Sequence, residues 1–243
     1  MPVTVSAIVP VYNEEGAAVQ VARDIVTAFS PVFGKEGFEI VVVDDCSTDA
    51  THERLVAAQS ELPNLRVLRH EYNVGKSGAM RTGVFAARGA LVVTLDGDGQ
   101  NPAEDAARML QILAAAPEQV GMVAGQRRNR QDKLSKKWAS RWANGIRKSL
   151  LKDGSDDTGC GLKALRREVF LRLPYFDQMH RYLPSLVTRE GFDILFESVG
   201  DRLRTTGHSK YTNIGRLAVA LSDLPGVMWL NRRLRQPGKV SES

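Results

Sequence analysis

The chain has 243 residues, 43% of them hydrophobic, and a formal net charge of +5, so it is long enough to fold as one sizeable α/β domain with its own core. Two cysteines, Cys46 and Cys160, are too few and too far apart to indicate a disulfide framework or a zinc site, and we expect a reducing, cytoplasmic location. The first residues carry no signal-peptide pattern and no stretch reaches about 18 uninterrupted apolar residues, so we expect neither a secreted protein nor a transmembrane helix.

Strands and helices are predicted to alternate over the first half of the chain. Apolar runs predict strands at about 3–11, 38–43, 65–68, 90–95 and 120–125. Helical patterns lie between them, at about 15–29, from after residue 49 to about 60, at 75–88 and at about 102–116. The run 38–43 is typical of a strand buried on both faces. This alternation predicts βα units and a mainly parallel sheet, until the rhythm ends near residue 126.

Two carboxylates one residue apart follow the fourth predicted strand. In an extended segment the side chains of Asp96 and Asp98 point to the same side, so they can converge on one ion. Gly97 adds no side chain between them, and Gly99 lets the backbone bend just after the strand. Hard divalent cations such as Mg²⁺ bind carboxylates together with substrate phosphates, so the pattern predicts a diphosphate–metal site. The alternative is a turn capped by aspartate and glycine.

Chemically reactive side chains follow three of the predicted strands. They lie in the segments Tyr12–Glu15, Asp44–Asp45 and Asp96–Asp98. In parallel sheets, ligands gather beyond the carboxyl ends of the strands, so we expect one active site there. Asp44 and Asp45 also suit turn and helix-capping roles, which leaves both readings open.

The segment from Arg127 to Lys152 is strongly basic, with ten Lys or Arg residues and one acid. It predicts a local anionic partner, which could be phosphate, anionic lipid or nucleic acid. An apolar residue recurs there every four positions, which predicts a helix with an apolar stripe: Leu134, Trp138, Trp142, Ile146 and Leu150. The stripe either packs on the domain or lies on an anionic lipid surface.

A second basic stretch, from Arg202 to Lys239, contains an apolar segment at 214–230. Asp223 and Pro225 interrupt that segment, so we expect it to be too short and too broken to span a bilayer.

Four motifs occur in order and in register with predicted strand ends: Ile8–Glu15, Val41–Asp49, Asn73–Lys76 and Leu95–Pro102. Together they resemble the inverting glycosyltransferases of family 2, in the branch of dolichol-phosphate mannosyltransferases and bacterial polyprenyl-phosphate glycosyltransferases. The resemblance covers about residues 3–212, and later segments agree with it: 157–163, 180–184 and 207–211. Gly97 and Gly99 depart from the common Asp-Ala-Asp-Leu-Gln form; they keep the carboxylates but can loosen the loop.

The resemblance implies a GT-A, Rossmann-like single α/β domain at 1–212 with a mainly parallel central sheet. A C-terminal amphipathic helical segment at 213–243 would then be juxtamembrane. It also implies a nucleoside-diphosphate sugar as donor and Mg²⁺ or Mn²⁺ as cofactor. Carried over by position, the nucleotide-sugar residues are Pro10, Tyr12, Glu14, Asp44, Lys76, Asp96, Asp98 and Gln100, and the metal residues are Asp96, Asp98 and Gln100.

Arg127 matches a basic residue expected to approach the donor or acceptor phosphate, and Asp157 is the acid nearest to a general-base role if the acceptor is an alcohol. His180, Arg181, Ser209 and Lys210 are further candidates for the acceptor phosphate, and Lys76 is equally typical of a solvated helix start.

The implied activity is transfer of a sugar to a polyprenyl phosphate at the cytoplasmic membrane face by a peripheral enzyme, aided or not by a membrane protein. The alternatives are a family 2 transferase acting on a soluble sugar or polysaccharide and, from another class, a basic nucleic-acid-binding protein. The basic stretch contains no recognised nucleic-acid-binding module, so we expect no nucleic-acid partner.

Overall fold

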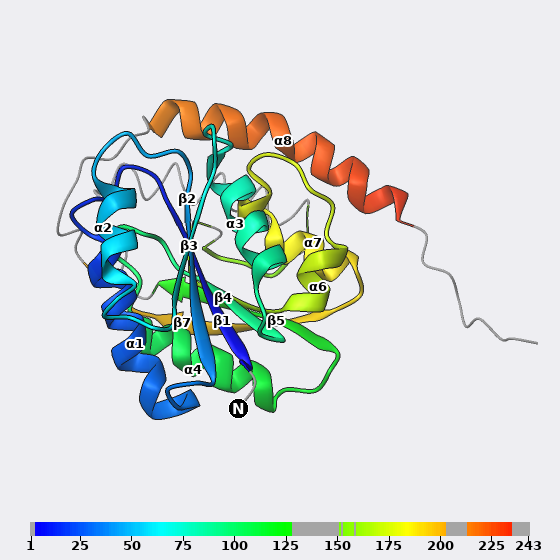
Figure 1. The fold of residues 1–243 in the computed structure, drawn as a ribbon. Helices are drawn as coiled ribbons and strands as arrows, with labels where there is room; N and C mark the ends of the chain where they lie inside the picture. The colour runs from blue at the N-terminus through cyan, green and yellow to red at the C-terminus, as the bar shows by residue number, and fades with distance from the viewer. Residues whose placement is uncertain (1–2, 128–150, 152, 158, 203–212, 235–243) are drawn as a thin grey trace, which may run out of the picture.

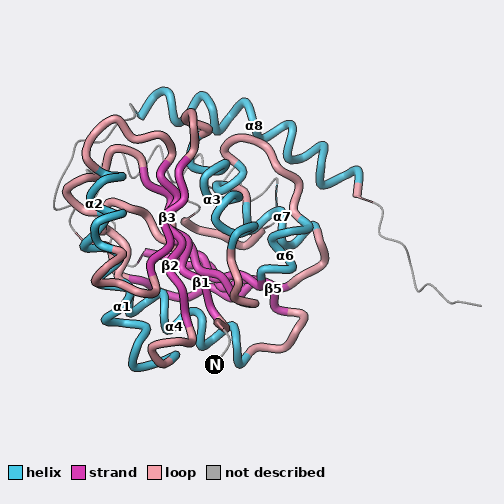
Figure 2. Tube along the Cα trace, in the orientation of Figure 1, coloured by secondary structure: helices cyan, strands magenta, loops and turns pink. Residues whose placement is uncertain are grey.

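The computed structural model describes residues 3–127, 151, 153–157, 159–202 and 213–234, with the backbone alone for 213–222. Within these residues, seven strands form one sheet in the order β3-β2-β1-β4-β6-β5-β7, and β6 alone runs antiparallel to its neighbours. Figures 1 and 2 show the twisted sheet at the centre of the molecule. The strands are β1 Val5–Val11, β2 Phe38–Asp44, β3 Leu65–Arg69, β4 Leu91–Thr94, β5 Val120–Arg127, β6 Lys163–Arg166 and β7 Asp193–Val199.

Helices cover both faces of the sheet and make three layers. Figure 1 shows α1 and α4 on one face, α3, α6 and α7 on the other, and α8 across the top of the molecule. The helices are α1 Ala18–Phe33, α2 Thr51–Ala58, α3 Gly75–Ala86, α4 Ala103–Ala115, α6 Arg167–Arg172, α7 Leu183–Arg189 and α8 Asn213–Arg233, with a 3₁₀ turn η1 at Met179–Arg181.

The two faces of the sheet have separate cores, and β2 contributes to both. All seven of its residues are buried. Ile40 and Val42 pack into the core under α1 and α4, whereas Val41 and Val43 pack into the core under α3. Successive strand residues point to opposite faces, so an apolar run is the expected sequence of a strand covered on both sides. The predicted doubly buried strand is confirmed.

The mainly parallel α/β sheet predicted from the sequence is confirmed, and its first five strands lie close to their predicted positions. β6 and β7 were not predicted. They fall where the βα rhythm ends, and β6 has only four residues. The predicted basic helix, apart from Arg127 and the buried Leu151, and the candidates Ser209 and Lys210 lie outside the described residues.

The C-terminal helix α8 is continuous through Pro225. Leu224 and Val227 are buried in the core under α3 and α7. Asn231 Nδ2 donates to Ser185 Oγ at 2.8 Å on α7. The second half of α8 is therefore docked on the domain, whereas the amphipathic character of the whole helix stays a prediction. Across the described residues, no helix is both long and apolar enough to cross a bilayer.

The buried carboxylate of Glu39 connects several segments at the amino end of the sheet. Glu39 is 3% exposed. It accepts hydrogen bonds from Ser6 Oγ at 2.8 Å, from Arg66 Nη1 at 2.6 Å and from the Arg88 backbone N–H at 2.5 Å. Burial alone would raise the pKa of Glu39, but these donors and the Arg66 charge lower it below its ordinary value.

Replacing Glu39 with Gln should lower the free energy of unfolding by about 1–3 kcal/mol, because Arg66 loses its charged partner. The stabilisation by the carboxylate is complete above the unfolded-state pKa near 4.5 and is lost as the pH falls through the lower folded-state pKa. Urea unfolding at pH 7 and at pH 3 should therefore show a smaller difference between wild type and variant at pH 3. Glu61→Gln, which affects an exposed pair with Arg23, is the matched control. Equal losses in the two variants would contradict this reading.

Candidate functional site

The predicted site residues are brought together because β1, β2 and β4 run parallel. Val11 pairs in register with Asp44, and Ile8 pairs with Thr94. Asp44 is the last residue of β2, while Tyr12 and Asp96 follow β1 and β4, so all three lie at the same edge of the sheet. The predicted clustering at this edge is confirmed.

The loop after β4 is folded by its own side chains. The Asp96 backbone N–H donates to Asn101 Oδ1 at 2.8 Å, and the Gln100 backbone N–H donates to Asp98 Oδ1 at 3.2 Å. Gly99 has φ of 77°, a conformation that favours glycine. A Cβ at Gly97 would lie 2.5 Å from Val11 Cγ1, so this position must be small for the loop to lie against β1. The two glycines that depart from the common motif therefore fit the local geometry, Gly97 by its close approach to β1 and Gly99 by its backbone conformation.

The carboxylate of Asp96 lies among cations. Its Oδ1 forms an ion pair with Lys76 Nζ. Burial would raise the pKa of Asp96, but Lys76 foremost, and also Lys163 and Arg127, lower it, so the group is an anion at neutral pH. Gly161 lies directly against this carboxylate, since a Cβ there would collide with both of its oxygens.

Lys163 was not assigned a role from the sequence. It is 4% exposed, and its Nζ donates to the Cys160 carbonyl oxygen. Burial lowers its pKa and Lys76 adds to this, while Cys160, Asp96 and Asp157 act in the opposite direction. Lys163 is the first residue of β6. The sequence signal that could have indicated a role for it is its place as the last residue of the 157–163 segment. Cys160 is buried.

Arg127 and Asp157 form a two-bond ion pair at the end of β5. Arg127 Nε and Nη2 donate to the two Asp157 oxygens at 2.7 and 3.1 Å, and Asp201 lies 3.7 Å from Nη1. Burial would lower the pKa of Arg127, but Asp157 and Asp201 raise it. In this arrangement Asp157 orients the guanidinium.

His180 lies on η1 beside the first turn of α3. Its Nδ1 is 2.8 Å from Ser77 Oγ. Burial, reinforced by the charges of Lys76, Lys163 and Arg181, lowers the pKa of His180 well below its ordinary value, so the imidazole is neutral at pH 7. The structure therefore brings His180 close to two of the cations around Asp96, Lys76 and Lys163, and Arg181 is its neighbour on η1.

The loops after β1 and β2 are joined by hydrogen bonds. Asn13, with φ of 52°, accepts from the Thr48 backbone N–H at 2.8 Å, and the Glu14 backbone N–H donates to Thr51 Oγ1 at 2.8 Å. Tyr12 is 38% exposed beside them, and Pro10 is half-buried at the end of β1. Gln100 lies at the other end of the edge, where its Nε2 donates to the Arg202 carbonyl at 3.5 Å.

Asp44 and Asp45 have different environments. The buried Asp44 accepts a hydrogen bond from the Ser47 N–H at 2.9 Å through Oδ1. Its Oδ2 accepts no hydrogen bond but lies at ion-pair distance, 3.5 Å, from both His52 Nδ1 and Arg69 Nε. Asp45 accepts from the Val74 and Gly75 N–H groups at 2.9 and 2.8 Å. Asp45 thus accepts the N–H groups at the start of α3, whereas Asp44 holds a buried oxygen between Arg69 and His52.

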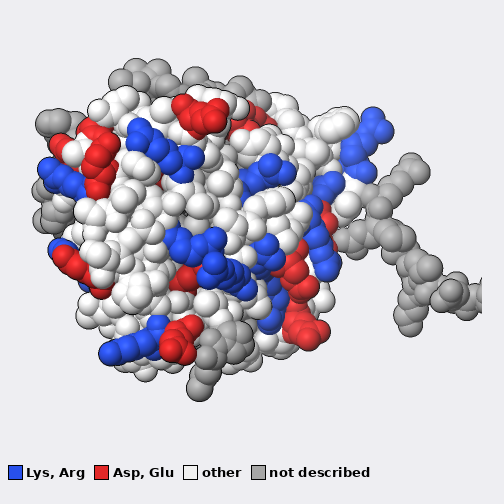
Figure 3. Space-filling view, in the orientation of Figure 1, with Lys and Arg blue, Asp and Glu red and all other residues white. Residues whose placement is uncertain are grey.

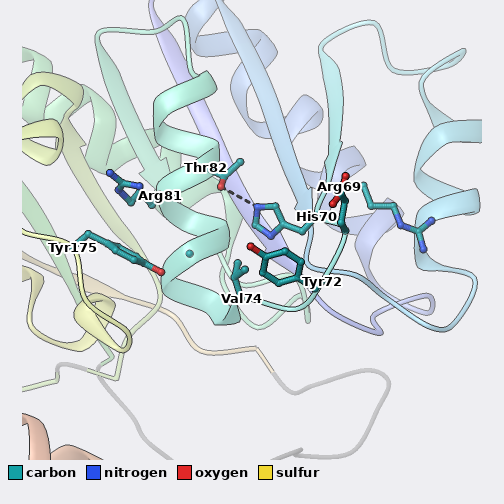
Figure 4. A pocket seen from close by; sticks show the side chains of 9 residues that line it. Arg69, His70, Tyr72, Val74, Arg81, Thr82 and Tyr175 are labelled. Carbon is teal, nitrogen blue, oxygen red and sulfur yellow. Dashed lines mark hydrogen bonds between the residues drawn. The ribbon is translucent and has the colours of Figure 1, made fainter.

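A separate cavity of about 430 Å³ lies on the outer side of α3. Figure 4 shows Tyr72 and His70 on one side of it and Arg81 with Tyr175 on the other. Arg81 stacks on the rings of Phe85 and Tyr175, at 4.6 and 4.9 Å from their centroids. None of the predicted site residues lines this cavity. On the face seen in Figure 3, charged side chains of both signs are interspersed.

The carboxylates at the end of β4 fit a hard divalent cation. Asp96 and Asp98 supply oxygen donors, which such ions prefer. Across the described residues no group of three or more His, Cys, Asp or Glu side chains is arranged to hold a metal. Phosphate oxygens and water are ligands that would complete the coordination of such an ion.

Residues 6–173 match the sequence model of the family described as Glycosyl transferase family 2. Dodecaprenyl-phosphate galacturonate synthase of Rhizobium johnstonii is 32% identical over 238 residues, which cover 96% of this chain and 69% of that protein. Glucosyl-3-phosphoglycerate synthase of Mycobacterium tuberculosis, solved with Mn²⁺, UDP and glucosyl-3-phosphoglycerate, aligns at 20% identity with a TM-score of 0.69 over 97% of this chain and 82% of that chain. The same enzyme with Mg²⁺ and UDP gives a TM-score of 0.70 at 20% identity, over 97% and 81% of the two chains.

Replacing Asp157 with Asn should lower the free energy of unfolding by about 1–3 kcal/mol, because the half-buried Arg127 loses its charged partner. Glu104→Gln removes one partner of the exposed pair with Arg202 and should cost less than about 0.5 kcal/mol. Urea unfolding followed by fluorescence measures both. Indistinguishable midpoints for the two variants would refute a structural role for the Arg127–Asp157 pair.

Proposed function

We propose a reaction for this chain, which belongs to glycosyl transferase family 2. It transfers a sugar from a nucleoside-diphosphate sugar to a polyprenyl phosphate, with inversion of the anomeric carbon. The chain is a glycosyltransferase of the polyprenyl-phosphate branch with a GT-A fold. The observation that carries the proposal is the group of cations, Lys76, Lys163 and Arg127, around the carboxylate of Asp96. Such a group suits a reaction that brings two phosphate-bearing substrates together.

The proposed reaction is a single displacement. An oxygen of the acceptor phosphate bonds to the anomeric carbon as the bond from that carbon to the diphosphate breaks, and the electron pair leaves with the nucleoside diphosphate. A phosphate monoester is largely ionised near neutral pH, so no general base is needed. Lys76, Lys163 and Arg127 would reduce the repulsion between the two substrates, and fixed positioning would supply much of the remaining acceleration.

Asp96 and Asp98 would hold Mg²⁺ or Mn²⁺, with Gln100 beside them. When bound, the ion stabilises the charge that develops on the departing diphosphate. The oxygen donors of the loop after β4 support this assignment, as do the Mn²⁺ and Mg²⁺ ions in the solved structures of similar fold.

The remaining candidates divide between donor and acceptor. The position of Asp44 at the end of β2, in register with the end of β1, supports a contact with the base or ribose of the nucleotide. His180, close to Lys76 and next to Arg181, supports a place for the acceptor phosphate. The residues proposed for the nucleotide sugar are Pro10, Tyr12, Glu14, Asp44 and Lys76, and those for the acceptor are Arg127, His180, Arg181, Ser209 and Lys210.

With Mn²⁺, a short polyprenyl phosphate and the correct donor sugar nucleotide, the protein should release nucleoside diphosphate and form a sugar product that extracts into organic solvent. A panel of UDP and GDP sugars identifies the donor. Product found only with soluble sugar or phosphorylated-acid acceptors would contradict the lipid acceptor, and no turnover with any acceptor would contradict the proposal as a whole.

Within that assay, Asp98→Asn should lose at least about a hundredfold in turnover, because a neutral amide is a weaker ligand for a hard cation. Asp193→Asn, which changes an exposed carboxylate at the amino end of β7, is the matched control and should keep wild-type turnover. Wild-type activity in Asp98→Asn would argue against the metal assignment.

We also propose that the enzyme works at the cytoplasmic face of the membrane, with residues 213–243 as a juxtamembrane segment next to a catalytic domain at 1–212. Trp229 is 57% exposed on α8, and the Arg233 guanidinium lies 5.6 Å from the centroid of its ring. Tryptophan with neighbouring arginines is typical of a surface that meets anionic lipid headgroups.

The intact protein should therefore float with vesicles containing anionic lipid, and Trp229→Ser should float less because it loses the interfacial ring. Vesicles of neutral lipid are the control. If the intact protein stays at the bottom of the gradient with anionic vesicles, attachment by lipid alone is wrong and a membrane protein partner is required.

A further inference from the structure

The ion pair between Lys76 and Asp96 lies where a small ion can reach it. The two side chains are 38% and 28% exposed, and Lys76 Nζ contacts Asp96 Oδ1. Across the described residues no other carboxylate forms an ion pair with Lys76. The carboxylate that would bind a divalent ion is therefore also the partner of a lysine.

The backbone that carries Lys76 is held in place. Asp45 binds the Val74 and Gly75 N–H groups at the start of α3, and Asn73 Nδ2 donates to the Asp45 carbonyl at 3.0 Å. A lysine side chain is a flexible four-carbon stem with one charged end. The charge of Lys76 can move away from Asp96 by side-chain rotation while the helix stays fixed.

The other cations of the site have no such freedom. Lys163 is 4% exposed and bonded to the Cys160 carbonyl. Arg127 is bound through two hydrogen bonds to Asp157. Asp96 thus has two fixed cations in its surroundings and a single exchangeable one, Lys76.

A divalent ion that approaches the protein alone would have to displace Lys76 and leave that ammonium without a partner. If the ion arrives with a diphosphate, the same ammonium gains phosphate oxygens as new partners. Metal binding without the diphosphate and metal binding with it therefore differ by the free energy of one charge pair, that of the Lys76 ammonium with an anion. This free energy is substantial at a partly buried site.

We propose that Lys76 is an exchangeable counter-ion that keeps Asp96 from binding the divalent cation until the donor diphosphate provides Lys76 with a new partner. This inference rests on the proposed function, since it takes Asp96 as a metal ligand. Metal and nucleotide would then bind with strong positive coupling, and that coupling would depend on Lys76.

The test is a titration of Mn²⁺, with the free ion measured by electron paramagnetic resonance. It is carried out on the full chain alone, with UDP and, separately, with GDP. The wild type should bind Mn²⁺ weakly alone and much more tightly with one of the nucleotides. Lys76→Met should bind Mn²⁺ alone about tenfold more tightly than the wild type, because the competing charge is gone. Its gain from the nucleotide should be correspondingly smaller.

Lys35→Met, which removes an exposed lysine from the loop before β2, is the matched control and should behave as wild type. Lys76→Arg keeps the competing charge and should retain the weak binding of Mn²⁺ alone. Thermal unfolding checks that Lys76→Met is folded, and a misfolded protein would lose binding in both conditions rather than gain it in one.

The possible outcomes distinguish a failure of the role proposed for Lys76 from a failure of the metal assignment. Equal Mn²⁺ affinity of wild type and Lys76→Met without nucleotide, with tight binding in its presence, would overturn the role of Lys76 and leave the metal assignment intact. Absence of Mn²⁺ binding with either nucleotide would overturn the metal assignment and the inference together.

Discussion

A negative charge held at the end of β4 is the constraint on which the rest of the site depends. A carboxylate in a partly buried position needs compensating charge, or it takes up a proton. The compensation for Asp96 comes from three elements: Lys76 at the start of α3, Arg127 at the end of β5 and Lys163 at the start of β6. The strand order explains how they meet, because β6 lies between β4 and β5. The antiparallel strand β6 thus contributes Lys163 to the balance of the negative charge on Asp96.

The first half of the fold could be predicted from the sequence because its signals are local and repeated. Apolar runs of strand length alternate with helical patterns, and the polar residues that follow the strands share one edge. β7 shows why the prediction stopped there: Asp193 and Leu195 are exposed, so its burial pattern has no clear alternation. β6 has four residues and pairs with strands about 40 and 70 positions away, information that no local pattern contains.

The two adjacent aspartates, Asp44 and Asp45, show that a local sequence pattern does not distinguish the roles of neighbouring site residues. Asp44 and Asp45 are equivalent by motif, yet Asp44 Oδ2 lies between Arg69 and His52, whereas the carboxylate of Asp45 accepts the N–H groups at the start of α3. The difference depends on where the loop before α3 returns, which is a tertiary contact. Lys163 was missed for the same reason, since its neighbours come from α3 and the loop after β4. The edge at which Asp96 and Asp98 lie could be predicted because both follow the apolar run of β4 directly in the sequence.

The long connection between β5 and β6 begins and ends at the same place. β5 ends at Arg127, and β6 begins at Lys163 and runs antiparallel to β4, so both points lie at the carboxyl edge beside Asp96. An insertion anchored in this way can change in length or composition while every strand keeps its partner. The sequence of this connection can therefore diverge during evolution independently of the half of the domain that contains β1 to β4.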